Sequence, residues 1–430
     1  MKYSLKNGYI VIPTDSGFKV EKKDIYLNNG KISYKKIDVD KELDLNGSIV
    51  MPGLVNAHHH IYSTLSKGVP VEGPLNDFVG TLEKLWWKLD RVLEKDDVVA
   101  STKITLQDCI KHGVSTVFDH HISVPFIKGS LDTMAKEFEK YNLNGVLAFE
   151  ISDRNGEKIF EESLNENISF YLKNKDNPKM KGTIGLHASF TVSDESLVKI
   201  KDGIGDAPIH IHVAEAKSDV DKTIEISGLR VIERLEKFNL LNDNSLIVHG
   251  NILSDKELSI LKEKNIFMIH NPDSNMNNTL VIKNISETLE KGLTLTIGTD
   301  GMTSNMLKSF KNAFLLNRYI NQNPDTGWGE ANDVLVNSFK MKKAYGFDLG
   351  VTEGDNIDLI VFDYKPATPF NDNTFLGHFL FGLTEARVQY FFKDDKVLLD
   401  NYKLTINEES DFFEKTSKKS EQLFDRFTKI

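Results

Sequence analysis

Residues 51–67, MPGLVNAHHHIYSTLSK, place three consecutive histidines, His58, His59 and His60, after a short apolar run. Successive side chains of a β-strand point to opposite faces, so a strand here directs His58 and His60 to one side and His59 to the other. Neutral imidazoles are common metal ligands, and two of them at the end of a parallel strand suit a divalent cation. A cluster of hydrogen-bonded histidines explains this stretch equally well, so the rest of the chain must decide.

Alternating strand and helix patterns fill residues 52–349 and predict an α/β barrel domain. Helical stretches, such as 96–113 and 131–142, separate short apolar runs that are rich in β-branched residues. Such alternation implies a parallel sheet, and eight strands are the number in a (β/α)8 barrel of the TIM type. The predicted strands are residues 55–60, 115–120, 145–152, 183–190, 208–215, 245–250, 266–272 and 294–300.

The two chain ends, residues 1–51 and 350–430, have a different pattern. They contain short alternating segments, and the N-terminal end has Asn-Gly turns at 7–8 and 29–30, which is typical of β-hairpins. We predict that both ends pair into one small β-sandwich, with a helix at the C-terminus. Two unrelated small β units are the alternative.

Charge and cysteine content narrow the class of protein. The formal net charge of −10 disfavours nucleic acid or an anionic membrane as the main partner, because both prefer a basic surface. The single cysteine, Cys109, allows no intramolecular disulfide and suits a reducing compartment. No apolar run approaches the length of a membrane span or a leader. We therefore expect a cytoplasmic protein with neither nucleic-acid nor membrane partners.

Nearly every predicted strand ends in a residue that is capable of chemistry, and active sites of (β/α)8 barrels lie at these ends. His58, His60, His212 and Asp300 together offer three nitrogens and one oxygen. Zinc accepts such ligands, and it lowers the pKa of a bound water to ~7. Iron and manganese also bind mixed nitrogen and oxygen sites. Asp300 alone would more simply be a turn-capping residue.

Two further residues suit proton transfer. Glu215 follows His212 by three residues, beyond the strand end, where a carboxyl group can act as a general acid and base. A solvated glutamate at a helix N-terminus is the simpler alternative. His249 ends the strand 245–250 and should point into the same cavity. His210, deeper on the face of His212, is expected to pack behind it.

The motifs PGLVNAHHH, HVAE, VHG, HNPDSN and GTDG, in this order, resemble the amidohydrolase superfamily. The closer resemblance is to its cytosine-deaminase-like aminohydrolase branch. Within that branch, HHHIYSTLSKG, FDHH, EISDRNG, GLHASFTVSD and HNPDSNMNN are most similar to the SsnA-type aminohydrolases. The resemblance covers essentially the whole chain, including both predicted halves of the sandwich.

This resemblance implies a set of roles. One divalent ion, zinc first and iron or manganese as alternatives, would bind His58, His60, His212 and Asp300. Catalysis would use Glu215 as the proton shuttle, with His249 orienting the nucleophile and Asp300 or His249 accepting its proton. His187 would contact substrate, and a histidine there, in place of the carboxylated lysine of binuclear relatives, favours one metal.

Three positions remain open between alternatives. Glu150 departs from the family pattern, and it could hold an amino-substituted ring or bridge a second metal; we favour substrate contact. The resemblance assigns the loop from Asn271 to Asn275 to the substrate pocket, although an ordinary turn fits the same residues. Arg154 could meet an anionic substrate group, but we expect a surface salt bridge.

The predicted function is hydrolytic deamination of an amino-substituted nitrogen heterocycle, related to purines. One alternative uses the same residues to open a cyclic amide or to displace a halide or alkylamine. Another is a non-catalytic barrel that binds a small molecule, although every ligand position here is filled. The resemblance also implies that the chain can form a homo-oligomer.

Overall fold

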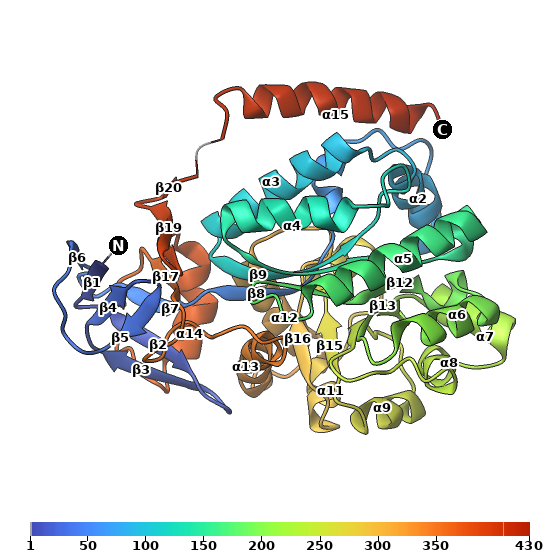
Figure 1. The fold of residues 1–430 in the computed structure, drawn as a ribbon. Coiled ribbons are helices and arrows are strands. Elements are labelled where there is room, and N and C mark those ends of the chain that lie inside the picture. The colour runs from blue at the N-terminus through green and yellow to red at the C-terminus, as the bar shows by residue number, and fades with distance from the viewer. Residues whose placement is uncertain (1, 407) are drawn as a thin grey trace.

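The computed structural model describes residues 2–406 and 408–430, and a barrel of parallel strands occupies their centre (Figure 1). Eight of the described strands form its wall, in the order β8, β9, β10, β12, β13, β14, β15 and β16. A bridge between Ile151 and Leu186 joins β10 to β12, and a bridge between His59 and Asp300 joins β16 back to β8. The predicted (β/α)8 barrel is thus confirmed. The bounds are β8 Leu54–His59, β9 Val114–His121, β10 Asn144–Phe149, β12 Ile184–Ala188, β13 Ile209–Val213, β14 Leu246–His249, β15 Phe267–His270 and β16 Leu295–Ile297.

Helices follow the barrel strands and cover the outside of the wall (Figure 1). In α4 the buried side chains Leu131, Met134, Phe138 and Tyr141 recur every three or four residues, which is the spacing of one helix face. At the start of α9, Ser254 and Glu257 cap each other. The outer helices are α3 Lys95–Lys111, α4 Ser130–Tyr141, α5 Glu157–Asn174, α6 Asp194–Ile204, α7 Lys217–Ser227, α8 Val231–Lys237, α9 Asp255–Lys262, α11 Ile285–Glu290, α12 Met306–Asn321 and α13 Trp328–Ala344.

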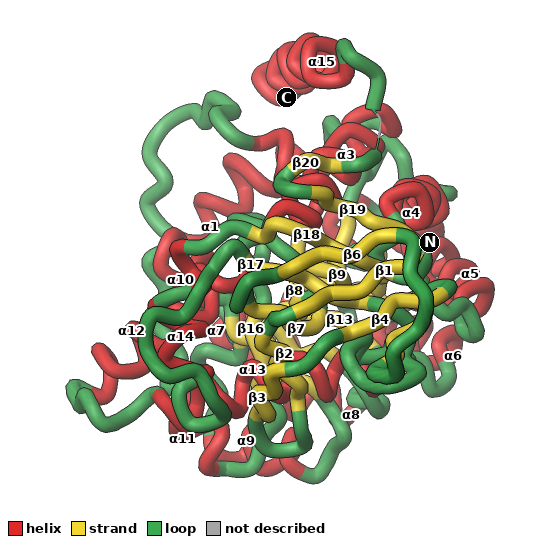
Figure 2. Tube along the Cα trace, turned by 90° about the vertical axis from the view of Figure 1, so that its left-hand side faces the viewer, coloured by secondary structure: helices red, strands yellow, loops and turns green. Residues whose placement is uncertain are grey.

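Both chain ends contribute to a second β unit beside the barrel, as predicted (Figure 2). Strand β17 pairs antiparallel with β7, which joins the C-terminal strands to the N-terminal ones. The sheets have the orders β20-β19-β18-β17-β7-β2-β3 and β5-β4-β1-β6, and apolar side chains such as Leu5, Val50 and Leu359 pack between them. The domain boundaries at 51/52 and 349/350 stay a prediction. The strands are β1 Lys2–Lys6, β2 Tyr9–Pro13, β3 Phe18–Lys22, β4 Ile25–Asn28, β5 Lys31–Ser33, β6 Lys41–Asp44, β7 Ile49–Pro52, β17 Asp358–Phe362, β18 Val388–Lys393, β19 Lys396–Asp400 and β20 Lys403–Leu404.

The remaining elements surround the barrel mouth or close the C-terminus. The amphipathic helix α15 lies along α3, where Arg426 forms an ion pair with Asp97 (Figure 1). The long segment after β8 folds over the mouth and contains a π-helical turn at Leu82–Trp86. The remaining bounds are η1 Ile61–Ser66, α1 Phe78–Thr81, α2 Trp87–Asp90, β11 Met180–Gly182, α10 Pro272–Asn277, α14 Phe375–Phe381 and α15 Phe412–Thr428, with single 3-10 turns at Asp153–Asn155, Ser189–Thr191 and Leu383–Glu385.

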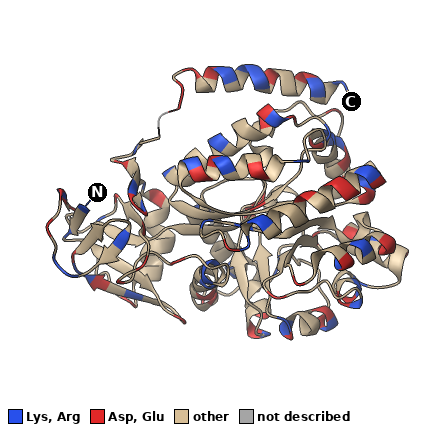
Figure 3. Cartoon of the chain, viewed as in Figure 1, with Lys and Arg blue, Asp and Glu red and all other residues tan. Residues whose placement is uncertain are grey.

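Charged side chains of both signs are interspersed on the outer helices (Figure 3). None of the helices in the described part of the chain is both long and apolar enough to cross a bilayer.

A buried cluster of charges ties the barrel to the sandwich. Asp358, at the start of β17, accepts hydrogen bonds from the ammonium groups of Lys342 on α13, at 2.7 Å, and of Lys393 on β18, at 3.0 Å. All three side chains are at most 4% exposed. A buried charge that loses its partner is costly, so the carboxylate of Asp358 should stabilise the junction of the two units.

We expect Asp358→Asn to lower the free energy of unfolding by about 3–5 kcal/mol, because it leaves two buried ammonium groups without a carboxylate. Urea unfolding followed by circular dichroism measures the change. Asp38→Asn, at an exposed position, is the matched control and should stay within about 0.5 kcal/mol of wild type. Equal loss in both variants would contradict this role of the buried cluster.

Candidate metal centre and active site

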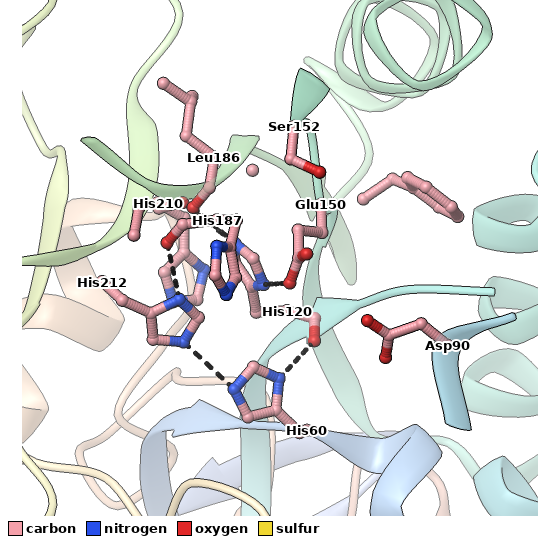
Figure 4. Close-up of polar contacts among 12 residues, drawn as sticks. His60, Asp90, His120, Glu150, Ser152, Leu186, His187, His210 and His212 are labelled. Atoms are coloured by element: carbon pink, nitrogen blue, oxygen red, sulfur yellow. Dashed lines mark hydrogen bonds and ion pairs between the residues drawn. The ribbon is translucent and has the colours of Figure 1, made fainter. Parts of the chain in front are cut away.

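Three histidines converge at the mouth of the barrel (Figure 4). His58 and His60 come from the end of β8, and His212 comes from β13, on the other side of the mouth. One ring nitrogen of each lies within 4.8 Å of the others, and the Nε2 atoms of His60 and His212 are only 3.1 Å apart. All three residues are buried. The parallel register of the wall therefore gathers donors that are 154 positions apart in the sequence.

The outer hydrogen bonds fix which nitrogen faces the centre. His60 donates from Nδ1 to the carbonyl oxygen of His120 at 2.6 Å, and His212 donates from Nδ1 to that of His187 at 2.8 Å (Figure 4). Because a carbonyl oxygen only accepts, both Nε2 atoms carry inward lone pairs. The buried Nε2 of His58 has no hydrogen-bond partner among the described residues. Burial and the neighbouring His60 lower the pKa of His212 to about 3, so a metal cation fits this group better than protons do.

Asp300 adds a carboxylate to the histidine group. Its Oδ1 lies 3.2 Å from Nε2 of His60 and 3.8 Å from Nε2 of His58. The residue follows β16 in a left-handed backbone conformation, with φ of 54°, and its amide donates to the carbonyl oxygen of His58 at 3.0 Å. Gly298 permits this approach, since an added Cβ would lie 2.8 Å from Cβ of His58. Three nitrogens and one oxygen form a suitable set for a divalent ion.

Glu215 and His249 lie beside the same carboxylate. Nε2 of His249 is 3.5 Å from Oε2 of Glu215 and 3.7 Å from Oδ2 of Asp300. The amide oxygen of Asn275 accepts from Nδ1 of His249 at 3.0 Å, which turns Nε2 toward the carboxylates. Burial, with the charges of Asp300 and Asp219, raises the pKa of Glu215 well above its ordinary value. A carboxyl group that holds its proton near neutral pH can act as a general acid.

A pocket opens over this group at the mouth of the barrel. Aromatic side chains from the segment after β8 form one wall, and polar groups from the strand ends form the floor. The lining residues are His60, Tyr62, Ser63, Phe78, Leu82, Trp86, Trp87, Asp90, Glu150, His187, Ala188, Phe190, His212, Glu215, Asp219, Ser274, Asn277, Asn278, Asp300, Gly301 and Met302.

The structure brings two of the four predicted substrate-binding residues to this pocket. Glu150 and His187 line it, whereas Asn271 and Asn275 do not. Both asparagines are fully buried, and Asn275 binds His249 instead. The physical reason is the short helix α10, which begins directly after Asn271 and turns other side chains toward the pocket: Ser274, Asn277 and Asn278.

Sequence reasoning missed a polar group on the pocket wall. Asp90 lines the pocket beside Glu150, and burial raises the pKa of both carboxyl groups. Arg154 pairs with Glu150 and lies 3.5 Å from Asp90. The expected surface salt bridge of Arg154 is therefore wrong, because only 10% of this side chain is exposed. No local pattern could reveal this group, since Asp90 reaches it from the long segment over the mouth.

The sequence of the chain matches a known protein family. The profile of the amidohydrolase family matches residues 49–398. The chain belongs to the amidohydrolase family. A 5'-deoxyadenosine deaminase of Methanosarcina acetivorans is 29% identical over 98% of both chains. A 5-methylthioadenosine/S-adenosylhomocysteine deaminase of Thermococcus sibiricus is 27% identical over 93% of this chain and 94% of its own.

A solved structure agrees with the fold of this amidohydrolase. An adenosine deaminase from Xanthomonas campestris, solved with bound zinc, superposes with a TM-score of 0.82 at 20% identity, covering 100% of this chain and 99% of its own. Enzymes of the amidohydrolase family generally use a divalent metal ion, and the converging donors described above agree with that dependence. The predicted family is confirmed.

We expect His58→Ala and His212→Ala to reduce the bound metal from about one ion per chain to a small fraction of that, because each removes one of four donors. Mass spectrometry of the dialysed protein measures the metal content. His112→Ala is the matched control, since His112 lies in a different surface pocket and should keep the wild-type content. Unchanged metal in both site variants would contradict the proposed ligands.

Asp219 predicts a pH dependence of stability. Burial raises its pKa from 3.8 to about 7, so its stabilising contribution is complete below pH 4 and is lost as the pH rises to about 7. Asp219→Asn stays neutral, and it should gain stability relative to wild type over this range, by at most about 1.4 kcal/mol per pH unit. Urea unfolding at several pH values measures the difference. Asp221→Asn, exposed on the same helix, should show the same change of unfolding free energy with pH as the wild type. The same result for Asp219→Asn would contradict this prediction.

Proposed function

We propose that this protein is a metal-dependent aminohydrolase that removes the amino group from an adenine nucleoside as ammonia. One observation carries the proposal: the carboxyl group of Glu215 lies beside His249 and Asp300, at the edge of a three-nitrogen, one-oxygen donor set that faces a pocket. The nucleoside class is supported by the relatives named as 5'-deoxyadenosine and 5-methylthioadenosine/S-adenosylhomocysteine deaminases.

The donor set is proposed to hold one zinc ion on His58, His60, His212 and Asp300. When bound, the ion supplies a coordinated water whose pKa is near neutrality. Zinc is favoured because imidazole and carboxylate ligands suit it and because the Xanthomonas campestris structure contains it. The ligand assignment rests on the convergence of the Nε2 atoms and on the unpaired Nε2 of His58.

The remaining groups handle protons. His249 and Asp300 lie where they can take up the proton that the attacking water loses, since their side chains face each other across 3.7 Å. Burial raises the pKa of Glu215, which favours its protonated form, and the group is placed to deliver a proton to the ring nitrogen beside the reacting carbon. It then takes the proton of the hydroxyl group added to the carbon and passes it to the amino group, which leaves as ammonia while the carbon keeps the oxygen of the water. The proton held by His249 or Asp300 then returns to Glu215.

The pocket walls fit a flat heterocycle with a substituent. His187 lines the floor beside the histidine group, and its Nδ1 is fixed by the hydroxyl group of Thr191 at 3.0 Å, which leaves Nε2 for the ring. Trp86, Trp87 and Phe190 supply apolar faces on which a purine can stack. We therefore place the amino-bearing edge of the ring at Glu215 and the rest of the nucleoside toward the mouth.

The ring-opening alternative needs a second metal, for which Glu150 was the candidate bridge. Arg154 pairs with Glu150 and competes for that carboxylate, and Glu150 is in neither group of converging metal donors. We therefore favour a single ion and deamination. Homo-oligomer formation stays a prediction.

We expect the zinc-loaded protein to release ammonia from 5'-deoxyadenosine or adenosine, because relatives over nearly the whole chain carry deaminase names. An enzyme-coupled ammonia assay, together with the absorbance shift from adenine to hypoxanthine, measures the reaction. Guanine, cytosine and an amino-triazine belong in the same panel. If ammonia is released only from one of those compounds, the proposed nucleoside substrate is wrong. If no compound releases ammonia, the proposed deamination is wrong.

We expect Glu215→Gln to lower kcat by about 10²–10⁴-fold, the usual contribution of a positioned acid or base, while the metal content stays at the wild-type level. Steady-state kinetics and metal analysis of one preparation measure both quantities. Glu225→Gln, at an exposed position on helix α7, which follows Glu215 in the chain, is the matched control and should leave kcat unchanged. Full activity in Glu215→Gln would contradict the assigned proton shuttle.

A further inference from the structure

The pocket has a strongly one-sided set of charges. Five of its lining residues carry carboxyl groups, and none of the described residues that line it is a lysine or an arginine. Glu215, Asp219 and Asp300 belong to the reacting end. The other two are Asp90, which lies across His60 from His212, and Glu150, which lies next to His120 (Figure 4). The proposed reaction does not use this second pair.

One guanidinium group lies behind the carboxyl wall formed by Asp90 and Glu150. Arg154 pairs through Nη2 with Glu150 and lies, through Nη1, 3.5 Å from Oδ2 of Asp90. Its guanidinium also covers the ring of Trp87, with 4.7 Å to the ring centre. Two carboxylates and the indole therefore occupy this cation, and it does not itself line the pocket.

Asp90 has an acceptor that no group in the described chain satisfies. The residue is 2% exposed, and its Oδ1 lacks a hydrogen-bond partner although the side chain lines the pocket. A buried acceptor without a donor is costly. Such groups are rare in native proteins, and a functional role or a bound partner is one explanation for them. The wall is therefore suited to receive hydrogen-bond donors.

We propose that the carboxyl wall of Asp90 and Glu150 selects substrates by charge: it accepts a substituent that is neutral or cationic and donates hydrogen bonds, and it rejects an anionic one. This inference rests on the proposed function, because it assumes that the amino-bearing edge of the nucleoside lies at Glu215. It narrows the substrate class to adenine nucleosides whose remote substituent carries no carboxylate or phosphate.

The expected charge preference follows from which groups of the wall are already paired. A carboxylate brought to this wall would meet the unpartnered acceptor Oδ1 of Asp90 and would find the one nearby cation, Arg154, already paired with Glu150. Charges interact strongly in a buried pocket, where little water screens them. An ammonium group would meet the opposite situation, because it can donate a hydrogen bond to Oδ1 of Asp90. Hydroxyl and ammonium groups can both donate hydrogen bonds to this wall.

The test compares three adenine nucleosides that differ only at the 5' carbon: 5'-deoxyadenosine, 5'-amino-5'-deoxyadenosine and adenosine-5'-carboxylic acid. Their Kd values for the zinc-loaded full-length protein can be measured by quenching of Trp86 and Trp87 fluorescence, independently of turnover. We expect the carboxylate to bind at least tenfold more weakly than the neutral compound, and the amine at least as tightly. A carboxylate that binds within tenfold of the neutral compound, or an amine that binds more weakly than it, overturns the proposal.

Substitutions in the carboxyl wall should change the order of the three Kd values. The double variant Asp90→Asn with Glu150→Gln leaves Arg154 without a carboxylate, so the carboxylate nucleoside should then bind more tightly than the neutral one. Asp90→Asn alone should reduce the difference in Kd between the carboxylate nucleoside and the neutral one. Thermal unfolding checks that both variants fold. Glu83→Gln, an exposed position on the same segment, is the control and should keep the wild-type order.

The outcomes separate this inference from the proposed function. Ordered binding without ammonia release would leave charge selection intact and overturn deamination. Ammonia release with equal Kd values for all three nucleosides would keep deamination and overturn charge selection. Failure of 5'-deoxyadenosine to bind, or an unchanged order in a folded double variant, would also overturn the charge selection.

Discussion

Inward-pointing imidazole lone pairs are the constraint on which the rest of the active site depends. The carbonyl oxygens of His120 and His187 hold the Nδ1 protons of His60 and His212. Their Nε2 atoms therefore face each other across 3.1 Å with no proton between them. Such an arrangement is unfavourable unless a cation relieves it, so the fold itself creates the need for a metal. Asp300 completes the charge balance from the opposite edge of the barrel wall.

The barrel supplies this geometry by bringing its first and last strands together. The bridge between His59 and Asp300 closes the wall at the metal site itself, and Gly298 lets the two backbones approach. The contact that closes the barrel therefore also places Asp300 next to the histidine ligands. The buried charges of Asp358 and its two lysines lie at the junction with the sandwich, so the sandwich stabilises the barrel without contributing a residue to the pocket.

The sequence was sufficient to predict the barrel and the converging residues, because the ends of parallel strands meet at one mouth whatever the loops do. It could not predict the environment of Asn271 and Asn275, since the rotation of one short helix decides which side chains face the pocket. Arg154 was expected at the surface, whereas it is buried between Glu150 and Asp90. Asp90 is 64 residues away, and local patterns carry no information on such a contact. The residues that select the substrate therefore depend on tertiary contacts that only the structure shows.

The central claim is that three imidazoles and one carboxylate share a single divalent ion. Anomalous diffraction at the zinc edge, from crystals of the zinc-loaded protein, tests it most directly. This account predicts one peak, at about 2.0–2.2 Å from Nε2 of His58, His60 and His212 and from a carboxylate oxygen of Asp300. A peak elsewhere, or a site bridged by Glu150 to a second peak, would contradict it.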